Sequence, residues 1–380
     1  MARRIIAAAD GAHADHALLE VEDLRTHFLT PAGRVRAVDG VSFELARGRT
    51  LGIVGESGSG KTVLARSIMG LLPRSNVQRT GAIRYSGNDI SDYSQAEMRS
   101  VWGPEMAMVF QDPMTSLNPV MRIGTQITES LRYHLDMSKA EANELAVSLL
   151  RSVGIPEPDK RLRDYPHQLS GGMRQRVVIA IALACGPKLL FADEPTTALD
   201  VTVQAQILNL LDTQQRERFM AMVLVTHDLG VIAGRAHDIA VMYAGRIVEK
   251  ASARTLFSSM RMPYTEALLE SIPKLEHRSH TRLASIPGRP PDLINPPAGC
   301  KFAPRCRYVQ PRCLEEEPPL TPGVDEGHVY RCFYPVGTEA GREALARNLA
   351  EGRVPVADEV ETGVVVGGPA PGADLDEGSW

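Results

Sequence analysis

The stretch Gly55-Glu-Ser-Gly-Ser-Gly-Lys-Thr62 constrains the fold of this chain more than any other. It fits the phosphate-binding pattern G-x-x-x-x-G-K-[ST] without a mismatch. The apolar run Leu51–Val54 precedes it and a helical pattern at Val63–Leu72 follows, which is the strand–loop–helix setting that the pattern needs. Glycines in such a loop let backbone N–H groups turn toward phosphate, and the helix adds its positive dipole end. The alternative, a Gly/Ser linker with a chance lysine, does not explain that setting.

The loop residues have distinct expected parts in binding a nucleotide. Lys61 is predicted to reach the β- and γ-phosphates, and the Thr62 hydroxyl to ligate Mg²⁺. The predicted phosphate-binding set is Gly55, Glu56, Ser57, Gly58, Ser59, Gly60, Lys61 and Thr62.

A second apolar strand, predicted at 188–192, delivers two acids, Asp193 and Glu194. Asp193 is predicted to hold Mg²⁺, and Glu194 to polarise the water that attacks the γ-phosphate. Two acids after a strand are weak evidence for a nucleotide site by themselves, but together with the upstream phosphate loop they become strong evidence.

The overall layout indicates a doubly wound α/β domain. A further strand is predicted at 222–225, and between Met121 and Val153 the apolar periodicity becomes helical. At 380 residues the chain is longer than a domain with a single compact core usually is, so one large domain with smaller attachments is expected.

A net charge of −4 argues against a nucleic-acid partner. The longest apolar run, Val177–Cys185, is far shorter than the ~18–20 residues that span a bilayer, and no secretory leader is apparent, so a cytosolic chain is expected.

The run Leu169-Ser-Gly-Gly-Met-Arg-Gln-Arg176 resembles the signature motif of ATP-binding-cassette ATPases. A glycine-rich turn at a helix start suits γ-phosphate binding, although a helix-terminal Gly turn is the structural alternative. The resemblance implies a cassette fold: a RecA-like core with an antiparallel β subdomain and an α-helical subdomain. It also implies a dimer in which each signature caps the ATP on the partner's phosphate loop. The site residues implied are Gln111 (a sensor of Mg²⁺ and water), Ser170, Gly171, Gly172, Asp200 in Ala198–Asp200, and His227 (contacting the γ-phosphate).

One family feature is missing from the sequence. The family stacks adenine on an aromatic residue, but the matching segment PAGRVRAV has none. Val35 is the predicted residue under the base, with Phe28 a second candidate.

Longer stretches narrow the resemblance to the D-type ATPase subunits of bacterial dipeptide/oligopeptide importers. They include VFQDPMTSLNP, LLFADEPTTALD, IPGRPPDL and GCKFAPRC, and the resemblance covers about residues 18–335. It implies a transport-coupled ATPase at the cytoplasmic face of the plasma membrane. The implied partners are a second homologous ATPase (a heterodimer), two transmembrane permease subunits and an extracytoplasmic substrate-binding protein. Import of nickel or another small solute, a soluble non-transport cassette ATPase and a metal or redox sensor remain alternatives.

Four of the five cysteines cluster as Cys300-x5-Cys306-x6-Cys313-x18-Cys332. In a reducing compartment, clustered cysteines favour metal ligation over disulfides. Zinc prefers C-x₂₋₄-C knuckles, which are absent from the sequence, whereas wider all-cysteine spacing suits a [4Fe–4S] cluster at least as well. The importer resemblance adds weight to the cluster. The fifth, Cys185, is predicted to be a buried small apolar residue.

The predicted organisation has four parts. They are a disordered N-terminus at 1–17, an ATPase domain at 18–263 with a helical subdomain at about 112–168, a four-cysteine extension at 264–335, and a disordered tail at 336–380.

Overall fold

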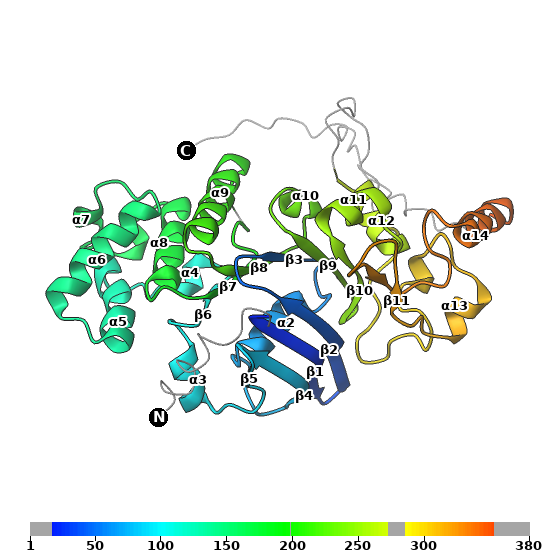
Figure 1. The fold of residues 1–380 in the computed structure, drawn as a ribbon, viewed down its shortest axis with the longest axis horizontal. Helices are drawn as coiled ribbons and strands as arrows, with labels where there is room; N and C mark the ends of the chain where they lie inside the picture. The colour runs from blue at the N-terminus through cyan, green and yellow to red at the C-terminus, as the bar shows by residue number, and fades with distance from the viewer. Residues whose placement is uncertain (1–16, 198, 273–285, 353–380) are drawn as a thin grey trace, which may run out of the picture.

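The computed structural model describes residues 17–197, 199–272 and 286–352, arranged around two β-sheets (Figure 1). The smaller sheet is antiparallel, with strand order β2-β1-β4-β5, and the larger is mixed, with order β11-β12-β10-β9-β3-β8-β7-β6. The strands of the smaller sheet are β1 (Leu19–Thr30), β2 (Gly33–Leu45), β4 (Val77–Tyr85) and β5 (Asn88–Asp89). Those of the larger are β3 (Thr50–Val54), β6 (Met106–Val109), β7 (Leu189–Asp193), β8 (Ala221–Thr226), β9 (Asp238–Tyr243), β10 (Arg246–Ser252), β11 (Thr321–Pro322) and β12 (Val329–Tyr330).

The centre of the large sheet is parallel. Strand β3 pairs in parallel with β8 and β9, and β7 pairs in parallel with β8 and β6. Every residue of β3, β7 and β8 is buried, as expected of strands covered on both faces. Parallel pairing brings the loops that follow β3, β6, β7 and β8 to one sheet edge, which confirms the predicted α/β layout.

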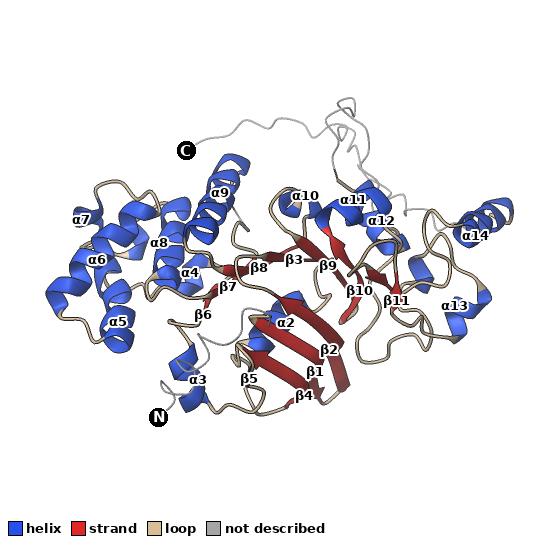
Figure 2. Ribbon diagram, in the orientation of Figure 1, coloured by secondary structure: helices blue, strands red, loops and turns tan. Residues whose placement is uncertain are grey.

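A group of helices forms the lobe beyond β6 (Figure 2). These are α4 (Pro113–Ser116), α5 (Ile123–Leu135), α6 (Lys139–Ser152), α7 (Pro158–Arg161), η1 (Pro166–Gln168) and α8 (Gly171–Leu183). Helix α6 begins at a capping box made by Ser138 and Glu141. Leu149 and Val153 are buried in the lobe's core, as the helical periodicity predicts.

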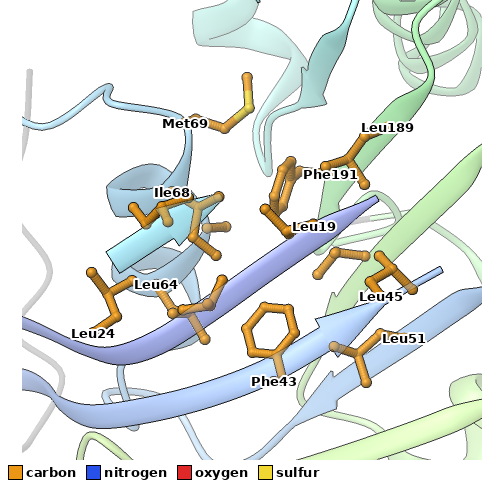
Figure 3. Close-up of a cluster of buried hydrophobic side chains, with 14 of the residues drawn as sticks. Leu19, Leu24, Phe43, Leu45, Leu51, Leu64, Ile68, Met69, Leu189 and Phe191 are labelled. Atoms are coloured by element: carbon orange, nitrogen blue, oxygen red, sulfur yellow. The ribbon is translucent and has the colours of Figure 1, made fainter. Parts of the chain in front are cut away.

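The two sheets share a hydrophobic core, shown in Figure 3. Leu19 and Phe43 from the small sheet pack with Leu64 of α2 (Lys61–Ile68) and Phe191 of β7. This core fixes helix α2 against the strand that ends at Asp193.

The remaining helices are α3 (Gln95–Val101), α9 (Val201–Glu217), α10 (Leu229–Ile232), α11 (Ala253–Ser259), α12 (Pro263–Glu270), η2 (Ala303–Arg305), α13 (Pro311–Glu315) and α14 (Glu339–Ala350). None of the helices in the described ranges is long and apolar enough to cross a membrane.

Residues 286–352, here called the C-terminal segment, continue the large sheet. Strand β12 pairs antiparallel with β10, matching Glu249 with Tyr330. The expectation of a disordered tail from residue 336 is wrong for residues 336–352, because α14 forms there. Asn348 of this helix is buried and donates hydrogen bonds to the carbonyls of Arg307 and Val309 at 2.8 and 2.9 Å. Residues 1–16 and 353–380 lie outside the described residues.

Candidate nucleotide-binding and hydrolysis site

The phosphate loop joins β3 to α2, and two of its glycines are required by close backbone contacts. A Cβ on Gly55 would lie 2.1 Å from the carbonyl oxygen of Met242. Gly60 has φ = +101°, and a Cβ there would lie 2.1 Å from the carbonyl oxygen of Ala37. These contacts explain why the loop needs glycine at both positions.

Lys61 is directed back over the loop rather than toward solvent. Its Nζ donates to the carbonyls of Gly55 at 2.8 Å and Glu56 at 3.0 Å, and the residue is 4% exposed. Burial lowers the pKa of the ammonium group, while the nearby carboxylates of Glu194, Asp193 and Glu56 act to raise it. A cation held over a loop in this way is placed to meet an anionic ligand.

Asp193 ends β7 and is fully buried. Its Oδ1 accepts a hydrogen bond from the Thr62 hydroxyl at 2.9 Å, whereas its buried Oδ2 has no hydrogen-bond partner among the described residues. Burial raises the pKa of this carboxyl, opposed by the Thr62 hydrogen bond. An unpartnered buried carboxylate oxygen beside a hydroxyl is a donor set that fits Mg²⁺.

Glu194 is contacted by side chains from two other loops and from its own. Its backbone is left-handed, with φ = +44°, and its N–H donates to the Val225 carbonyl of β8 at 2.9 Å. Its Oε2 accepts hydrogen bonds from Gln111 Nε2 and Thr197 Oγ1, each at 3.0 Å. His227 Nδ1, in the loop after β8, lies 3.4 Å from the same oxygen. The predicted catalytic residues Glu194, Gln111 and His227 are therefore brought together.

One cavity of about 1070 Å³ connects these groups. Its lining includes the phosphate-loop residues Glu56, Ser57, Gly58, Gly60, Lys61 and Thr62, the catalytic candidates Gln111, Glu194 and His227, and the base candidates Phe28 and Val35. The last two are cross-strand partners in the β1–β2 hairpin. The volume is large enough for a small-molecule ligand.

The signature residues lie elsewhere on the chain. Ser170 caps α8, its hydroxyl accepting from the Met173 N–H at 3.3 Å, and Gly171 and Gly172 form the first turn. Asp200 caps α9 by accepting from the Val203 N–H at 3.0 Å, and Ala198 lies outside the described residues. None of these described residues lines the cavity, so the structure does not bring them to the phosphate loop of the same chain.

Sequence reasoning missed the part of the cavity wall that the C-terminal segment supplies. Ile286, Pro290 and Leu293 line the same cavity, together with Leu268 and Ser271. The Leu293 carbonyl accepts a hydrogen bond from the Arg36 N–H at 3.1 Å, next to Val35. This segment has no motif spacing that relates it to the phosphate loop, so only the tertiary fold reveals the contact.

The four clustered cysteines line a second, small cavity in the C-terminal segment, with Met262 and Phe302 among the apolar residues around it. The Sγ atoms of Cys306 and Cys332 accept hydrogen bonds from the N–H groups of Tyr308 and Tyr334, each at 3.3 Å. Burial raises the pKa of the Cys300 thiol to about 11, and that of Cys306 well above its usual value. The part of the chain that the structure describes contains no group of three or more His, Cys, Asp or Glu side chains placed to hold a single metal ion.

Comparison with known proteins agrees with this geometry. The family model described as "ABC transporter" matches residues 38–197, and "Oligopeptide/dipeptide transporter, C-terminal region" matches residues 248–313. A solved structure, the dimeric ATP-binding cassette MJ0796 in a post-hydrolysis state bound to ADP and Pi, superposes with a TM-score of 0.56 at 26% identity, covering 62% of this chain and 99% of that one. Fold and site together define an ATP-binding-cassette ATPase, for which ATP and Mg²⁺ are the expected ligands.

The relatives resolve the class further. The oligopeptide transport ATP-binding protein OppD of Bacillus subtilis is 52% identical over 82% of this chain and 87% of its own length. The dipeptide transport ATP-binding protein DppD of Escherichia coli is 49% identical over 87% of this chain and 100% of its own length. The chain belongs to this family of oligopeptide and dipeptide transport ATP-binding proteins.

Proposed function

We propose that this chain is the ATP-hydrolysing subunit of a bacterial importer that takes up dipeptides or oligopeptides. The observation that carries the proposal is the convergence of Lys61, Thr62 and Glu194 on one cavity, with Asp193 hydrogen-bonded to Thr62 behind it. The relatives of this chain are named as peptide transport ATP-binding proteins. A nickel or other small-solute importer would use the same ATPase chemistry and is the alternative.

The geometry around Glu194 supports the proposed hydrolytic roles. Its carboxylate acts as the general base for the attacking water. Gln111 orients that carboxylate, and His227 contacts both it and the γ-phosphate. Lys61 holds the β- and γ-phosphates, together with the loop N–H groups.

Mg²⁺ is proposed to be held by Thr62, Asp193 and Gln111, which fits the unpartnered Oδ2 of Asp193. When bound, it supplies charge neutralisation at the phosphates. Val35 is proposed to lie under the adenine, with Phe28 beside it, so that apolar contact takes the place of aromatic stacking.

The cassette is proposed to work as a dimer with a homologous ATPase. The signature group Ser170, Gly171 and Gly172 does not line this chain's own cavity, so it is available to cap ATP on a partner. The first turn of α8 offers backbone N–H groups for that purpose. The dimeric state of the MJ0796 cassette supports the arrangement.

The helical lobe is proposed to contact two membrane permeases, which places the chain at the cytoplasmic face of the membrane. Met114, Val120 and Tyr133 in this lobe have exposed fractions of 62%, 80% and 65%. These exposed apolar side chains are available for contact with a protein partner. An extracytoplasmic binding protein is the expected source of the peptide.

Cys300, Cys306, Cys313 and Cys332 are proposed to ligate a [4Fe–4S] cluster. The donor type fits, because all four thiols line one buried cavity and two of them accept backbone N–H···S hydrogen bonds. Zinc is the alternative, but its sites favour C-x₂₋₄-C spacing, which these four cysteines do not have.

The experiment that tests the proposed function is co-expression with its genomic partners. The proposal predicts co-purification with two membrane proteins and ATPase activity stimulated by a peptide-loaded binding protein. Stimulation by nickel-loaded binding protein and not by peptide would favour the alternative. An ATPase that purifies without membrane partners and ignores both solutes would contradict the transport role.

A further inference from the structure

Arg305 links the C-terminal segment to the phosphate loop. The residue lies between two of the clustered cysteines in sequence and is 4% exposed. Its Nη1 and Nη2 donate to the two carboxylate oxygens of Glu56 at 2.6 and 2.9 Å, a bidentate ion pair across 249 positions of sequence. Paired donors of this type fix orientation as well as charge.

The other contacts of the guanidinium reach a different part of the cavity wall. Its Nε donates to the Pro287 carbonyl at 2.7 Å, and its Nη2 donates to the Ile286 carbonyl at 3.3 Å. Its Nη1 also lies 3.3 Å from the Tyr243 hydroxyl. Ile286 lines the nucleotide cavity, and the segment continues through Pro290 to Leu293 beside the base candidates.

Glu56 is itself part of the nucleotide site. Its side chain lines the cavity, and its carbonyl accepts a hydrogen bond from Lys61 Nζ at 3.0 Å. Its N–H donates to the Tyr264 hydroxyl at 2.9 Å, a second anchor from outside the loop. Burial lowers the pKa of Lys61, and the negative charge of Glu56 is one of the charges that act against this lowering. An unpaired carboxylate at this position would oppose the binding of a polyphosphate anion.

A purely structural role for this ion pair is the simplest alternative. Buried ion pairs contribute little net stability, and removal of one partner destabilises a fold without any link to function. Against that alternative, the Arg305 guanidinium donates to the Glu56 carboxylate and to the Ile286 carbonyl, and both of these residues line the same ligand cavity.

We infer that Arg305 is a positioning residue for nucleotide binding. It neutralises Glu56 and holds the phosphate loop, and at the same time it anchors the 286–293 wall over the base end of the cavity. The inference rests on the proposed ATPase function. It predicts an effect on nucleotide affinity and little effect on the hydrolytic step. The hydrogen bonds of the Arg305 guanidinium go to Glu56, Tyr243 and the 286–287 carbonyls rather than to the hydrolytic residues.

The test uses the full-length chain and its assembled complex. Binding of Mg-ATP is titrated with a fluorescent ATP analogue by competition, and KM and kcat are measured for Arg305→Gln, Arg305→Lys and the double variant Glu56→Gln/Arg305→Gln. The control is Arg307→Gln, since Arg307 belongs to the same segment but pairs with Glu266 and Glu270 of α12. Thermal unfolding of each variant separates loss of folding from loss of binding.

Arg305→Gln is expected to raise Kd and KM for ATP roughly 10-fold while kcat stays within about threefold of wild type. The double variant also removes the carboxylate that Arg305→Gln leaves unpaired. Its Kd for ATP should therefore return at least halfway toward the wild-type value on a logarithmic scale. Arg305→Lys keeps the charge and should give an intermediate value, which preserves the test if Arg305→Gln does not fold. The control should bind as wild type does.

Wild-type Kd and KM in both Arg305→Gln and Arg305→Lys, with only a lower melting temperature, would overturn the inference and leave a structural ion pair. A wild-type chain that neither binds nor hydrolyses ATP would instead contradict the proposed function.

Discussion

His227 Nδ1 lies 3.4 Å from Oε2 of Glu194, so the loop after β8 meets the acid that follows β7. The backbone hydrogen bond from Glu194 N–H to Val225 of β8 fixes the two strand ends relative to each other. The two side chains are therefore positioned by neighbouring parallel strands.

Replacing His227 with alanine tests the role of this contact. His227→Ala is expected to lower kcat on the order of 10²-fold, because it removes the group proposed to contact the charge that develops on the γ-phosphate. KM for ATP should change by less than about threefold, since Lys61 and the loop amides still bind the phosphates. Steady-state ATPase assays of the assembled complex give both constants. A large rise in KM with kcat unchanged would mean that His227 binds nucleotide and takes no part in hydrolysis.

Replacing Lys61 tests nucleotide binding rather than hydrolysis. Lys61→Met keeps the length of the buried stem but removes the ammonium group, so Kd for ATP should rise about 10- to 100-fold, the range of a lost charged hydrogen bond. Equilibrium titration with ATP measures the loss. Lys188→Met serves as a control for removal of a lysine charge, because Lys188 pairs with Glu105 at 3.3 Å, away from the cavity lining. Equal affinities of the two variants would contradict the role of Lys61.

Asp39 provides a prediction about stability and pH. Asp39 is 3% exposed, and its carboxylate forms ion pairs with Arg246 and Arg25, each at 2.9 Å. It also pairs with Lys301 of the C-terminal segment at 3.4 Å. Burial acts to raise the pKa of this carboxyl, but the hydrogen bond and charge of Arg246, with the charges of Lys301 and Arg25, outweigh it and hold the pKa well below its usual range.

Because the folded-state pKa lies below the unfolded value of ~3.9, the stabilisation by Asp39 is fully present above about pH 4 and is lost as pH falls through the folded pKa. Asp39→Asn should therefore lower the free energy of unfolding by about 3 kcal/mol at pH 7, and the difference from wild type should shrink below about pH 4. Urea unfolding across this pH range measures both effects. The matched control, Asp238→Asn, removes a partly exposed pair with Arg49 and should cost under about 1 kcal/mol. A constant difference down to pH 2 would contradict the account.

The sequence was informative where chemistry is encoded locally. The phosphate loop and the two acids at the end of β7 are each next to a short buried strand, so the pattern predicted their chemistry, whereas the role of His227 after β8 came from the family resemblance. The contact of Arg305 with Glu56 spans most of the chain and has no local signature, so it could not be predicted. Helix α14 was missed for a different reason. It buries only Gly341, Ala344 and Asn348, so the small and polar residues on its packed face give no apolar periodicity.

The four clustered cysteines give a spectroscopic prediction. Anaerobically purified protein should be brown, with broad absorption near ~400 nm and bound iron, if the thiols ligate an iron–sulfur cluster. Cys306→Ser should lose both the colour and the iron. Cys185→Ser is the control, because Cys185 lies in the helical lobe with its thiol 3.6 Å from the Ser130 carbonyl. A colourless wild-type sample with stoichiometric zinc would contradict the cluster.

The measurement that tests the central claim most directly is ATP turnover by Glu194→Gln in the assembled transporter. This variant keeps a side chain of the same shape beside Gln111 and His227 but cannot accept a proton from water. The account predicts loss of most of the hydrolysis catalysed at this chain's phosphate loop, on the order of 10²-fold or more in kcat, with ATP affinity retained. Turnover near the wild-type rate would contradict the assignment of Glu194 as the general base.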